Sequence, residues 1–409
     1  MTPLLRKLFG INWVLVLTMY GLLVFGLFAI ESAARHLKGG GELFADRQKE
    51  WILIGSVAYW LSALLDYRWL RLFGLPLYLA GLVLTGMAMA QGSEEHQITL
   101  LGLAFQPAQV AIAGGIVLAS VLVHDLGRLH RWLREPLVKI GVIGGVCAVP
   151  FLMVVKMGDM GSAIVWLPVT VVLLLMSGVP FRHLTLLCSA GAGAAAVVFF
   201  VLLPMASPRG ADRIDLYLDM LRGKPVDVAD EAYAPYYVSM AVGKAGWSGI
   251  GHRATAARGS MSLHDKGFIP KRTAHNDFIF AVIAEEHGFR GSLLLVTGFS
   301  LLLVTCLFIG FYARDLAGRM LVGGVVALVF AHLFENVGMC VLLTPITGIP
   351  LPLVSYSGTF VVICMFLLGL VQSVWIHRRP FDEAPAEARD PARPAAKAFA
   401  VHARIPPGL

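Results

Sequence analysis

The stretch AHNDFIFAVIAEEHGF, residues 274–289, joins a long polar segment of the chain to a strongly apolar one. It carries one Asp, two Glu and two His at this boundary. Ionisable side chains beside a lipid bilayer are energetically costly, and where they occur they usually serve binding or catalysis. The stretch therefore predicts both a point where the chain enters a membrane and the neighbourhood of a functional site.

The composition of the whole chain identifies the class of protein. Hydrophobic residues make up 57% and charged residues 14% of the 409 residues, and the mean hydropathy is +0.74. These values exclude a soluble domain and indicate an all-α polytopic membrane protein. Because a helix needs about 20 largely apolar residues to cross the hydrocarbon core, we expect about ten transmembrane helices. They fall at roughly 12–31, 51–66, 72–91, 107–124, 137–154, 160–178, 184–204, 288–312, 319–342 and 354–376.

The distribution of Lys and Arg among the loops predicts the orientation of these helices. With both termini in the cytoplasm, the cytoplasmic segments contain Arg6, Lys7, Arg68, Arg71, Arg128, Arg131, Arg134, Lys139, Arg182, Arg314, Arg319, Arg378 and Arg379. The first external loop also carries Lys and Arg, but Asp and Glu balance them. The positive-inside rule therefore favours an N-in, C-in topology. The net charge of +7 is explained by topology and contact with anionic lipids, and nothing in the sequence suggests nucleic acid.

This topology divides the chain into a transmembrane domain, residues 1–379, and a tail. One large extracytoplasmic loop, about residues 205–287, precedes the eighth helix, and we expect function to reside there. Residues 380–409 are rich in Pro, Ala, Glu and Arg and have too few apolar residues to bury a core. We expect them to form a disordered cytoplasmic tail.

Several outward-facing segments carry polar or strongly bent sequences. The large loop contains Arg213 in a short amphipathic stretch and Lys244 in the Gly-rich run 243–251. That run could bring backbone N–H groups close to an anion, although a plain loop is the more common role of such a sequence. Two external turns, 156–162 and 348–359, complete a set that can converge on one site.

These segments resemble the SEDS family (shape, elongation, division and sporulation). Residues 156–162 (KMGDMGS) are similar to the family pattern K-x-P-D-L-G-T, and residues 275–288 (HNDFIFAVIAEEHG) to H-T-D-F-I-F-A-x-x-x-E-E-x-G. Residues 348–359 (GIPLPLVSYSGT) are similar to G-x-P-L-P-x-x-S-Y-G-G-S, residues 243–251 to the family's Gly-rich loop, and residues 336–339 (NVGM) also match. The resemblance extends over essentially the whole chain to Arg379.

Within the family, Gln48, Trp51 and the string DYR at 66–68 resemble the elongation branch (RodA-like) more than the division branch (FtsW-like). The resemblance implies a peptidoglycan glycosyltransferase in the cytoplasmic (inner) membrane that polymerises lipid II at the outer face during cell elongation. It implies undecaprenyl pyrophosphate as the leaving group and a class B penicillin-binding protein, the transpeptidase, as the partner. Other roles stay open: a scaffold that only recruits the transpeptidase, a lipid II translocator, or an FtsW-like role in division.

The chemistry of glycan polymerisation requires a base and cationic help for a diphosphate. The resemblance assigns the base role to Asp277, which matches the family's essential carboxylate. It also suggests a divalent cation, Mg or Mn, whose ligands the sequence does not show. The residues expected to bind substrate are Lys156, Asp159, Arg213, Lys244, His275, Glu285, Glu286, Ser355 and Tyr356.

Each of these residues also has a structural alternative. Asp277 could cap a helix that starts at Phe278. Glu285 and Glu286 could serve acid–base chemistry or pair with Arg290 at helical spacing. The histidines of the stretch are more often interfacial polar residues than ligands. A carboxylate and an amide at Glu335 and Asn336, deep in the ninth span, should be turned inward and hydrogen-bonded because burying them is costly.

One motif departs from the family pattern. Where the family usually reads Q-P-S-E-x-x-K, this chain has Gln106-Pro107-Ala108-Gln109-Val110-Ala111-Ile112, so both the Glu and the Lys are missing. The loss favours the scaffold alternative, whereas the intact Asp277 motif favours the enzyme. Lys271 and Arg272 are candidates to compensate for the missing Lys.

Overall fold

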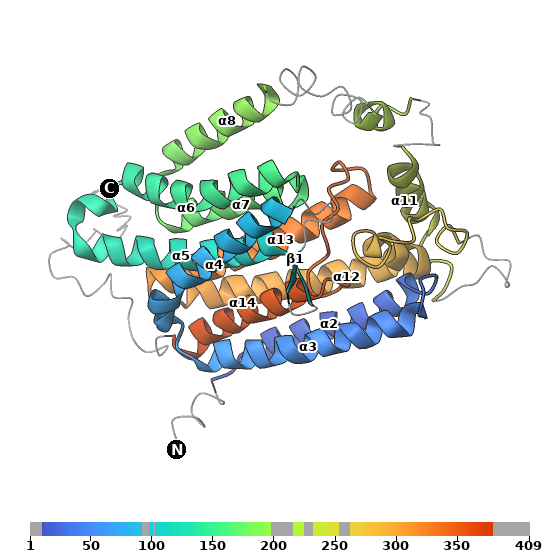
Figure 1. The fold of residues 1–409 in the computed structure, drawn as a ribbon, viewed down its shortest axis with the longest axis horizontal. Helices are drawn as coiled ribbons and strands as arrows, with labels where there is room; N and C mark the ends of the chain where they lie inside the picture. Colours follow the sequence, from blue (N-terminus) through green and yellow to red (C-terminus); the bar gives the residue numbers. More distant parts are fainter. Residues whose placement is uncertain are drawn as a thin grey trace, which may run out of the picture.

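The computed structural model of the chain describes residues 10–91, 98–100, 103–197, 216–224, 232–252 and 262–378. Long helices lying alongside one another form the body of the molecule (Figure 1). They are α2 (Trp13–Ala33), α3 (Gly40–Leu64), α4 (Leu70–Gln91), α5 (Pro107–Leu129), α6 (Pro136–Met157), α7 (Met160–Met176), α8 (Phe181–Val197), α11 (Tyr233–Lys244), α12 (Ile279–Phe311), α13 (Leu316–Cys340) and α14 (Thr359–Ile376). Two short 3₁₀ helices, η1 (Tyr67–Trp69) and η2 (Arg131–Arg134), lie between them, and β1 (Ile98–Leu100) pairs antiparallel with β2 (Leu103–Phe105).

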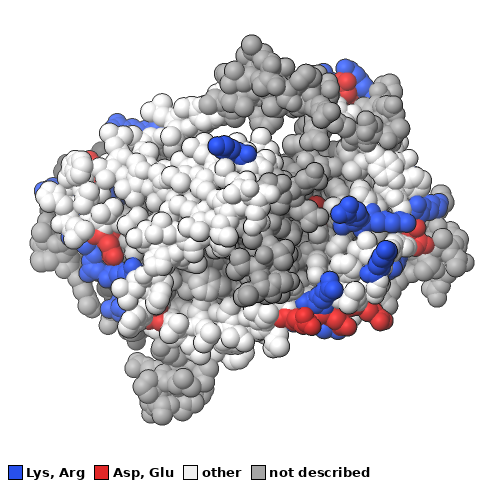
Figure 2. Space-filling model, in the orientation of Figure 1, with Lys and Arg blue, Asp and Glu red and all other residues white. Residues whose placement is uncertain are grey.

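Within the described part of the chain, seven helices are long and apolar enough to cross a membrane: those that contain α2, α4, α5, α6, α12, α13 and α14. Large apolar side chains cover the outside of the bundle, among them Leu17, Leu53 and Phe311. On the face shown in Figure 2, most charged side chains of the described residues gather toward the two ends of the molecule, and the described surface between them shows little charge. The chain is therefore a multi-pass membrane protein.

The remaining expected spans differ from the helices found. The expected span at 51–66 is the second half of α3, a helix of 25 residues that begins earlier, at Gly40, in sequence expected to be an external loop. The expected span at 160–178 is α7, which has 17 residues, and the expected span at 184–204 falls on α8, of which the structure describes residues up to Val197. The total of ten spans and the N-in, C-in orientation stay predictions.

Local sequence explains where the helices begin. Asn12, Asp159 and Asp315 each accept a hydrogen bond from a backbone N–H in the first turn of the helix that follows. Pro107 and Pro136 occupy the first position of α5 and α6, where no N–H is needed. The chain thus provides a start signal before each of these helices.

Glycines allow close contact between α4 and α5. A Cβ at Gly81 would lie 2.6 Å from the Ala111 Cα, and one at Gly114 would lie 2.7 Å from the Tyr78 Cα. Small residues let two helix backbones approach closely, which is how membrane helices gain packing energy without a hydrophobic driving force. Helices α3 and α14, α7 and α13, and α2 and α12 also pack as pairs.

The expected external loop at 205–287 contains helices of its own. Residues 216–221 are helical, α11 follows, and α12 begins at Ile279 rather than at residue 288. Gly288, with φ 64° and ψ −158°, interrupts α12 and separates a short first segment from the long apolar one. The expected tail, 380–409, and Arg213 lie outside the described residues.

Candidate active site

Asp277 lies in a turn immediately before α12, and its carboxylate is half-buried. The residue at the N-cap of α12 is Phe278, so the alternative that Asp277 caps a helix starting there is wrong. Among the described residues, no hydrogen-bond donor or cation contacts the Asp277 carboxylate. Burial raises the pKa of Asp277 to about 7, and the nearby Asp159 carboxylate adds to the rise.

The backbone around Asp277 is held by side chains from elsewhere in the fold. The Asn336 Nδ2 in α13 donates to the Asp277 carbonyl and to the Ile349 carbonyl, each at 2.8 Å. The Ser355 Oγ donates to the Asn276 carbonyl at 2.5 Å. Asn336 is fully buried, as expected for an amide in the ninth span, and its two bonds fix the position of Asp277 relative to the 348–359 segment.

His275 and Tyr356 complete this anchor. The Tyr356 N–H donates to the His275 carbonyl at 3.0 Å, and the two rings lie 5.4 Å apart between centroids. Phe44 packs edge-on against His275 at 4.8 Å. Burial lowers the pKa of His275 to about 4, so its ring is neutral at neutral pH. The structure therefore gives His275, Ser355 and Tyr356 contacts that position the backbone beside Asp277.

The 347–349 segment lies between the turn that carries Asp159 and the Asp277 side chain. A Cβ at Gly161 would lie 2.6 Å from the Thr347 carbonyl oxygen, and one at Gly348 (φ 72°) would lie 3.4 Å from the Asp277 Oδ2. The turn at 156–162, the 348–359 segment and the turn before α12 thus meet, as the sequence predicted. Asp159 Oδ1 accepts from the Ser162 N–H at 2.9 Å, whereas its Oδ2 is buried without a partner among the described residues.

The two carboxylates fit the divalent cation that the resemblance suggests. Hard cations such as Mg take oxygen ligands, and two neighbouring carboxylates repel each other unless a proton or a cation lies between them. The unpartnered Oδ2 of Asp159 and the carboxylate of Asp277 supply such oxygens. Glu335 lies close to the same segment, since its Oε1 accepts from the Thr347 Oγ1 at 3.1 Å.

The expected cationic residues lie on the surface. Lys156 is exposed in the last turn of α6, three residues before Asp159, and Lys244 is exposed in the last turn of α11. Lys271 and Arg272 are also exposed, in the turns that lead to Asp277. Along the chain, Lys156 is therefore close to Asp159, and the 271–272 pair is close to Asp277.

Glu285 and Glu286 anchor segments that lie far from α12 in the sequence. Glu285 accepts hydrogen bonds from the backbone N–H groups of Leu263 and His264 and from the Ser262 Oγ. Glu286 accepts from the Ser32 Oγ and lies 3.5 Å from the Arg35 guanidinium. Both carboxylates are buried and tie the large loop to α2 and α12.

The Gly-rich run 243–251 packs against the break in α12. The N–H groups of Ile250 and Gly251 donate to the carbonyls of Glu285 and Glu286, each at 3.0 Å. A Cβ at Gly249 would lie 2.6 Å from the Gly288 nitrogen, so neither glycine has room for a side chain. These two N–H groups are therefore used for hydrogen bonds within the fold, which favours the structural-loop role of the run over anion binding.

A neutral pair replaces the charges missing from the Gln106 motif. Gln109 and Ile112 are buried in α5, and the Gln109 Nε2 lies 3.3 Å from the His332 Nε2 in α13. The His332 Nδ1 lies 3.0 Å from the Leu328 carbonyl, so Nδ1 carries the proton and Nε2 accepts one from Gln109. His332 was not expected from the sequence, although its position one turn before Glu335 and Asn336 on the same helix face could have indicated it.

The family model described as "Cell cycle protein" (FtsW, RodA and SpoVE) matches residues 8–380. The chain belongs to this family. The SEDS resemblance is therefore confirmed. MrdB of Escherichia coli strain K12, a peptidoglycan glycosyltransferase, is 30% identical over 279 residues, which cover 67% of this chain and 69% of MrdB. FtsW of Neisseria gonorrhoeae, a probable peptidoglycan glycosyltransferase, is 31% identical over 403 residues, covering 87% of this chain and 82% of that protein.

Solved SEDS structures share the fold of this SEDS protein. The structure of RodA from Thermus thermophilus gives a TM-score of 0.62 at 22% identity and covers 90% of this chain and 98% of that one. A chain of a peptidoglycan synthase complex, described as coordinating polymerization and crosslinking, gives a TM-score of 0.72 at 22% identity and covers 91% of this chain and 99% of its own length. Relatives from both branches match at similar identity, and the RodA-like assignment stays a prediction.

Proposed function

We propose that this SEDS protein is a peptidoglycan glycosyltransferase that polymerises lipid II, with Asp277 as the general base. The observation that carries the proposal is the Asp277 carboxylate, half-buried and without a partner among the described residues. A carboxylate paired with Lys or Arg would be a weak base, whereas one whose pKa is raised to about 7 is matched to neutral pH. The names of the Escherichia coli and Neisseria gonorrhoeae relatives support the reaction.

The reaction forms one glycosidic bond and breaks one bond to diphosphate. The acceptor sugar hydroxyl attacks the anomeric carbon of the donor and passes its proton to Asp277, while undecaprenyl pyrophosphate leaves with the electron pair of the broken bond. The carbonyl bonds from Asn336 and Ser355 keep the Asp277 backbone in place during this transfer. Such positioning matters because a small misplacement of a base slows proton transfer strongly.

The leaving diphosphate needs positive charge. Lys156 and Lys244 are exposed at the ends of α6 and α11, and each can swing a flexible ammonium toward a phosphate. A Mg or Mn ion held through the Asp159 Oδ2, which has no partner among the described residues, would neutralise charge on the departing diphosphate, and the Asp277 carboxylate would stay free to act as the base. Arg213 is retained as a further candidate for phosphate binding.

We place the reaction at the outer face of the cytoplasmic membrane, with an N-in, C-in topology and the large loop outside. A class B penicillin-binding protein as transpeptidase partner is supported by the fold match to a chain of a peptidoglycan synthase complex. The resemblance of Gln48, Trp51 and residues 66–68 to the elongation branch supports a role in cell shape rather than in division.

The proposal is tested by lipid II polymerisation with the purified complex of this chain and its transpeptidase partner, free of other polymerases. Asp277→Asn keeps the size of the side chain and removes the base, so the rate should fall by at least about 100-fold. Asp46→Asn is the matched control, because Asp46 is exposed on α3 and contacts only Lys49 among the described residues. An Asp277→Asn variant that polymerises at the wild-type rate would remove Asp277 from the base role.

A scaffold that only recruits the transpeptidase is the second candidate, because Gln109 and Ile112 stand where the family usually has Glu and Lys. If the chain is only a scaffold, the wild-type protein should assemble the complex and stimulate the transpeptidase but form no glycan strands. Strand formation by the wild-type chain excludes this alternative.

A further inference from the structure

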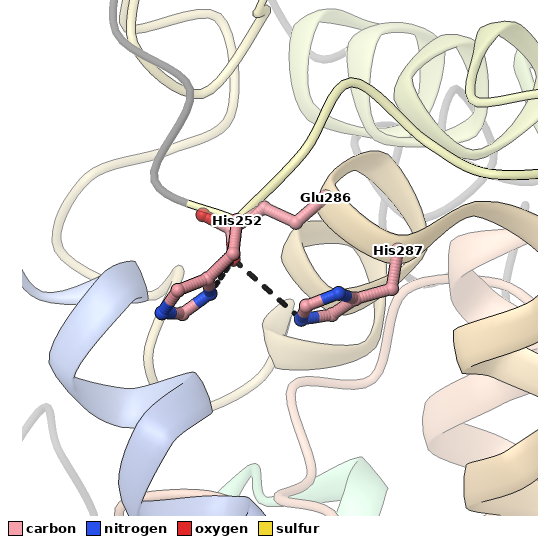
Figure 3. Close-up of side chains that lie close together, drawn as sticks. All are labelled: His252, Glu286 and His287. Atoms are coloured by element: carbon pink, nitrogen blue, oxygen red, sulfur yellow. Dashed lines mark hydrogen bonds and ion pairs between the residues drawn. The ribbon is translucent and has the colours of Figure 1, made fainter.

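His252, Glu286 and His287 turn three ligand atoms toward one another at the break in α12 (Figure 3). The His252 Nδ1 lies 3.0 Å and the His287 Nε2 4.0 Å from the Glu286 Oε2. The three atoms lie within 4.8 Å of one another, and the two rings stack at 5.5 Å between centroids with an interplanar angle of 13°. The arrangement brings together residues that are 34 positions apart in the sequence.

We infer that His252, Glu286 and His287 bind a transition-metal ion of the zinc class. Two imidazole nitrogens and one carboxylate oxygen are the donors that suit Zn, whereas Mg takes oxygen donors almost exclusively. Tetrahedral Zn with ligands at about 2.0–2.1 Å separates them by about 3.3 Å. The distance from His252 to Glu286 is already close to this value, and small movements of the two partly exposed histidine rings would bring the His287 nitrogen to the same spacing.

The contacts of Glu286 orient its carboxylate for metal binding. Its Oε2 faces the two imidazoles, while its Oε1 accepts from the Ser32 Oγ and lies 3.5 Å from the Arg35 guanidinium. Outer contacts of this kind orient a ligating carboxylate and strengthen metal binding. Glu286 is buried, whereas the two histidine side chains are partly exposed, so the buried carboxylate would anchor the ion and the two rings can adjust to it.

The fold also brings His252 to this place by backbone contacts. The Gly251 N–H, immediately before His252, donates to the Glu286 carbonyl at 3.0 Å. A metal ion here would join the end of the Gly-rich run to α12 next to Gly288. Glu285 lies in the same helix turn and holds the loop at 262–264. The ion would therefore also stiffen this loop, which precedes Asp277 in the chain. This site is separate from the oxygen-only pair of Asp159 and Asp277.

The inference is tested by metal binding to the full-length protein in detergent, after chelator treatment and removal of any polyhistidine tag. Calorimetry should find one Zn ion per chain, and Co should give the visible absorption of a four-coordinate site, while Mg should not compete. His252→Ala should weaken Zn binding at least about tenfold, and Zn should raise the unfolding temperature of the wild type but not of this variant.

His130→Ala is the matched control, since His130 is also exposed and lies in a different loop. Glu286→Gln is a second variant, because the amide oxygen can still accept from Ser32 while the ligand charge is lost. No Zn binding by the wild type, or Zn binding that is equally strong in His252→Ala and in Glu286→Gln, would overturn the inference. Neither outcome depends on whether the protein polymerises lipid II.

Discussion

If Asp277 removes the proton from the acceptor hydroxyl, the rate of glycan polymerisation should follow the ionisation of its carboxylate. Burial and the neighbouring Asp159 raise the pKa of Asp277 from 3.8 to about 7. Only the ionised form is a base, so activity should rise with pH through about 7. About a tenth of the carboxylate is ionised at about pH 6 and about nine-tenths at about pH 8, which predicts a rise of roughly tenfold over this range.

The assay is the initial rate of lipid II polymerisation at subsaturating substrate, with the enzyme and its transpeptidase partner at fixed concentration. Asp159→Asn removes the like charge beside Asp277 and should move the midpoint to lower pH. The Asp46→Asn control should keep the wild-type midpoint. A rate that is flat between about pH 6 and 8 would mean that Asp277 titrates as an ordinary carboxyl, and the reasoning from burial would be refuted.

Three further predictions concern Asn336, Gln109 and Gly288. Asn336→Ala removes two hydrogen bonds, one of them to the Asp277 carbonyl; kcat should fall by about 10–100-fold with a smaller change in KM, and equal kcat in steady-state kinetics would count against a positioning role. Gln109→Glu places a carboxylate in a buried neutral pair and should destabilise the protein by about 3 kcal/mol, and adding Ile112→Lys should recover part of this in thermal unfolding. An unchanged melting temperature for Gln109→Glu would contradict that expectation. Gly288→Ala should lower the unfolding temperature, because φ is 64° and a Cβ would lie 2.3 Å from the Gly249 nitrogen; a wild-type melting temperature would show that the break in α12 tolerates a side chain.

The sequence was sufficient for the class of fold because hydropathy is a local property. Each of the seven long apolar helices coincides with an expected span, and Asn12, Asp159 and Pro107 are recognisable start signals. Where polar residues continue a helix beyond the membrane, the same reasoning failed. The polar first half of α3 looked like a loop because no apolar run reveals it, although the segment contains good helix-forming residues.

The sequence pointed to the segments that meet around Asp277 but not to the contacts that each residue makes there. The motif at 275–288 indicated Asp277, and the turn before α12, the turn at 156–162 and the 348–359 segment meet beside it. The other positions in the site depend on hydrogen bonds between segments that are distant in the sequence. Glu286 accepts from Ser32, more than 250 residues away, and Ser355 donates to the Asn276 carbonyl. No periodicity predicts such contacts, and the exposed His252 joined Glu286 only when the Gly-rich run folded against α12.

The ionisation of the Asp277 carboxylate can be measured directly by infrared difference spectroscopy of the purified protein, with Asp277→Asn subtracted to isolate this one group. A base poised by burial should show a protonated carboxyl band below neutral pH that disappears with a midpoint near 7. A band that is absent above about pH 5 would contradict a raised pKa and, with it, the assignment of Asp277 as a base tuned by its surroundings.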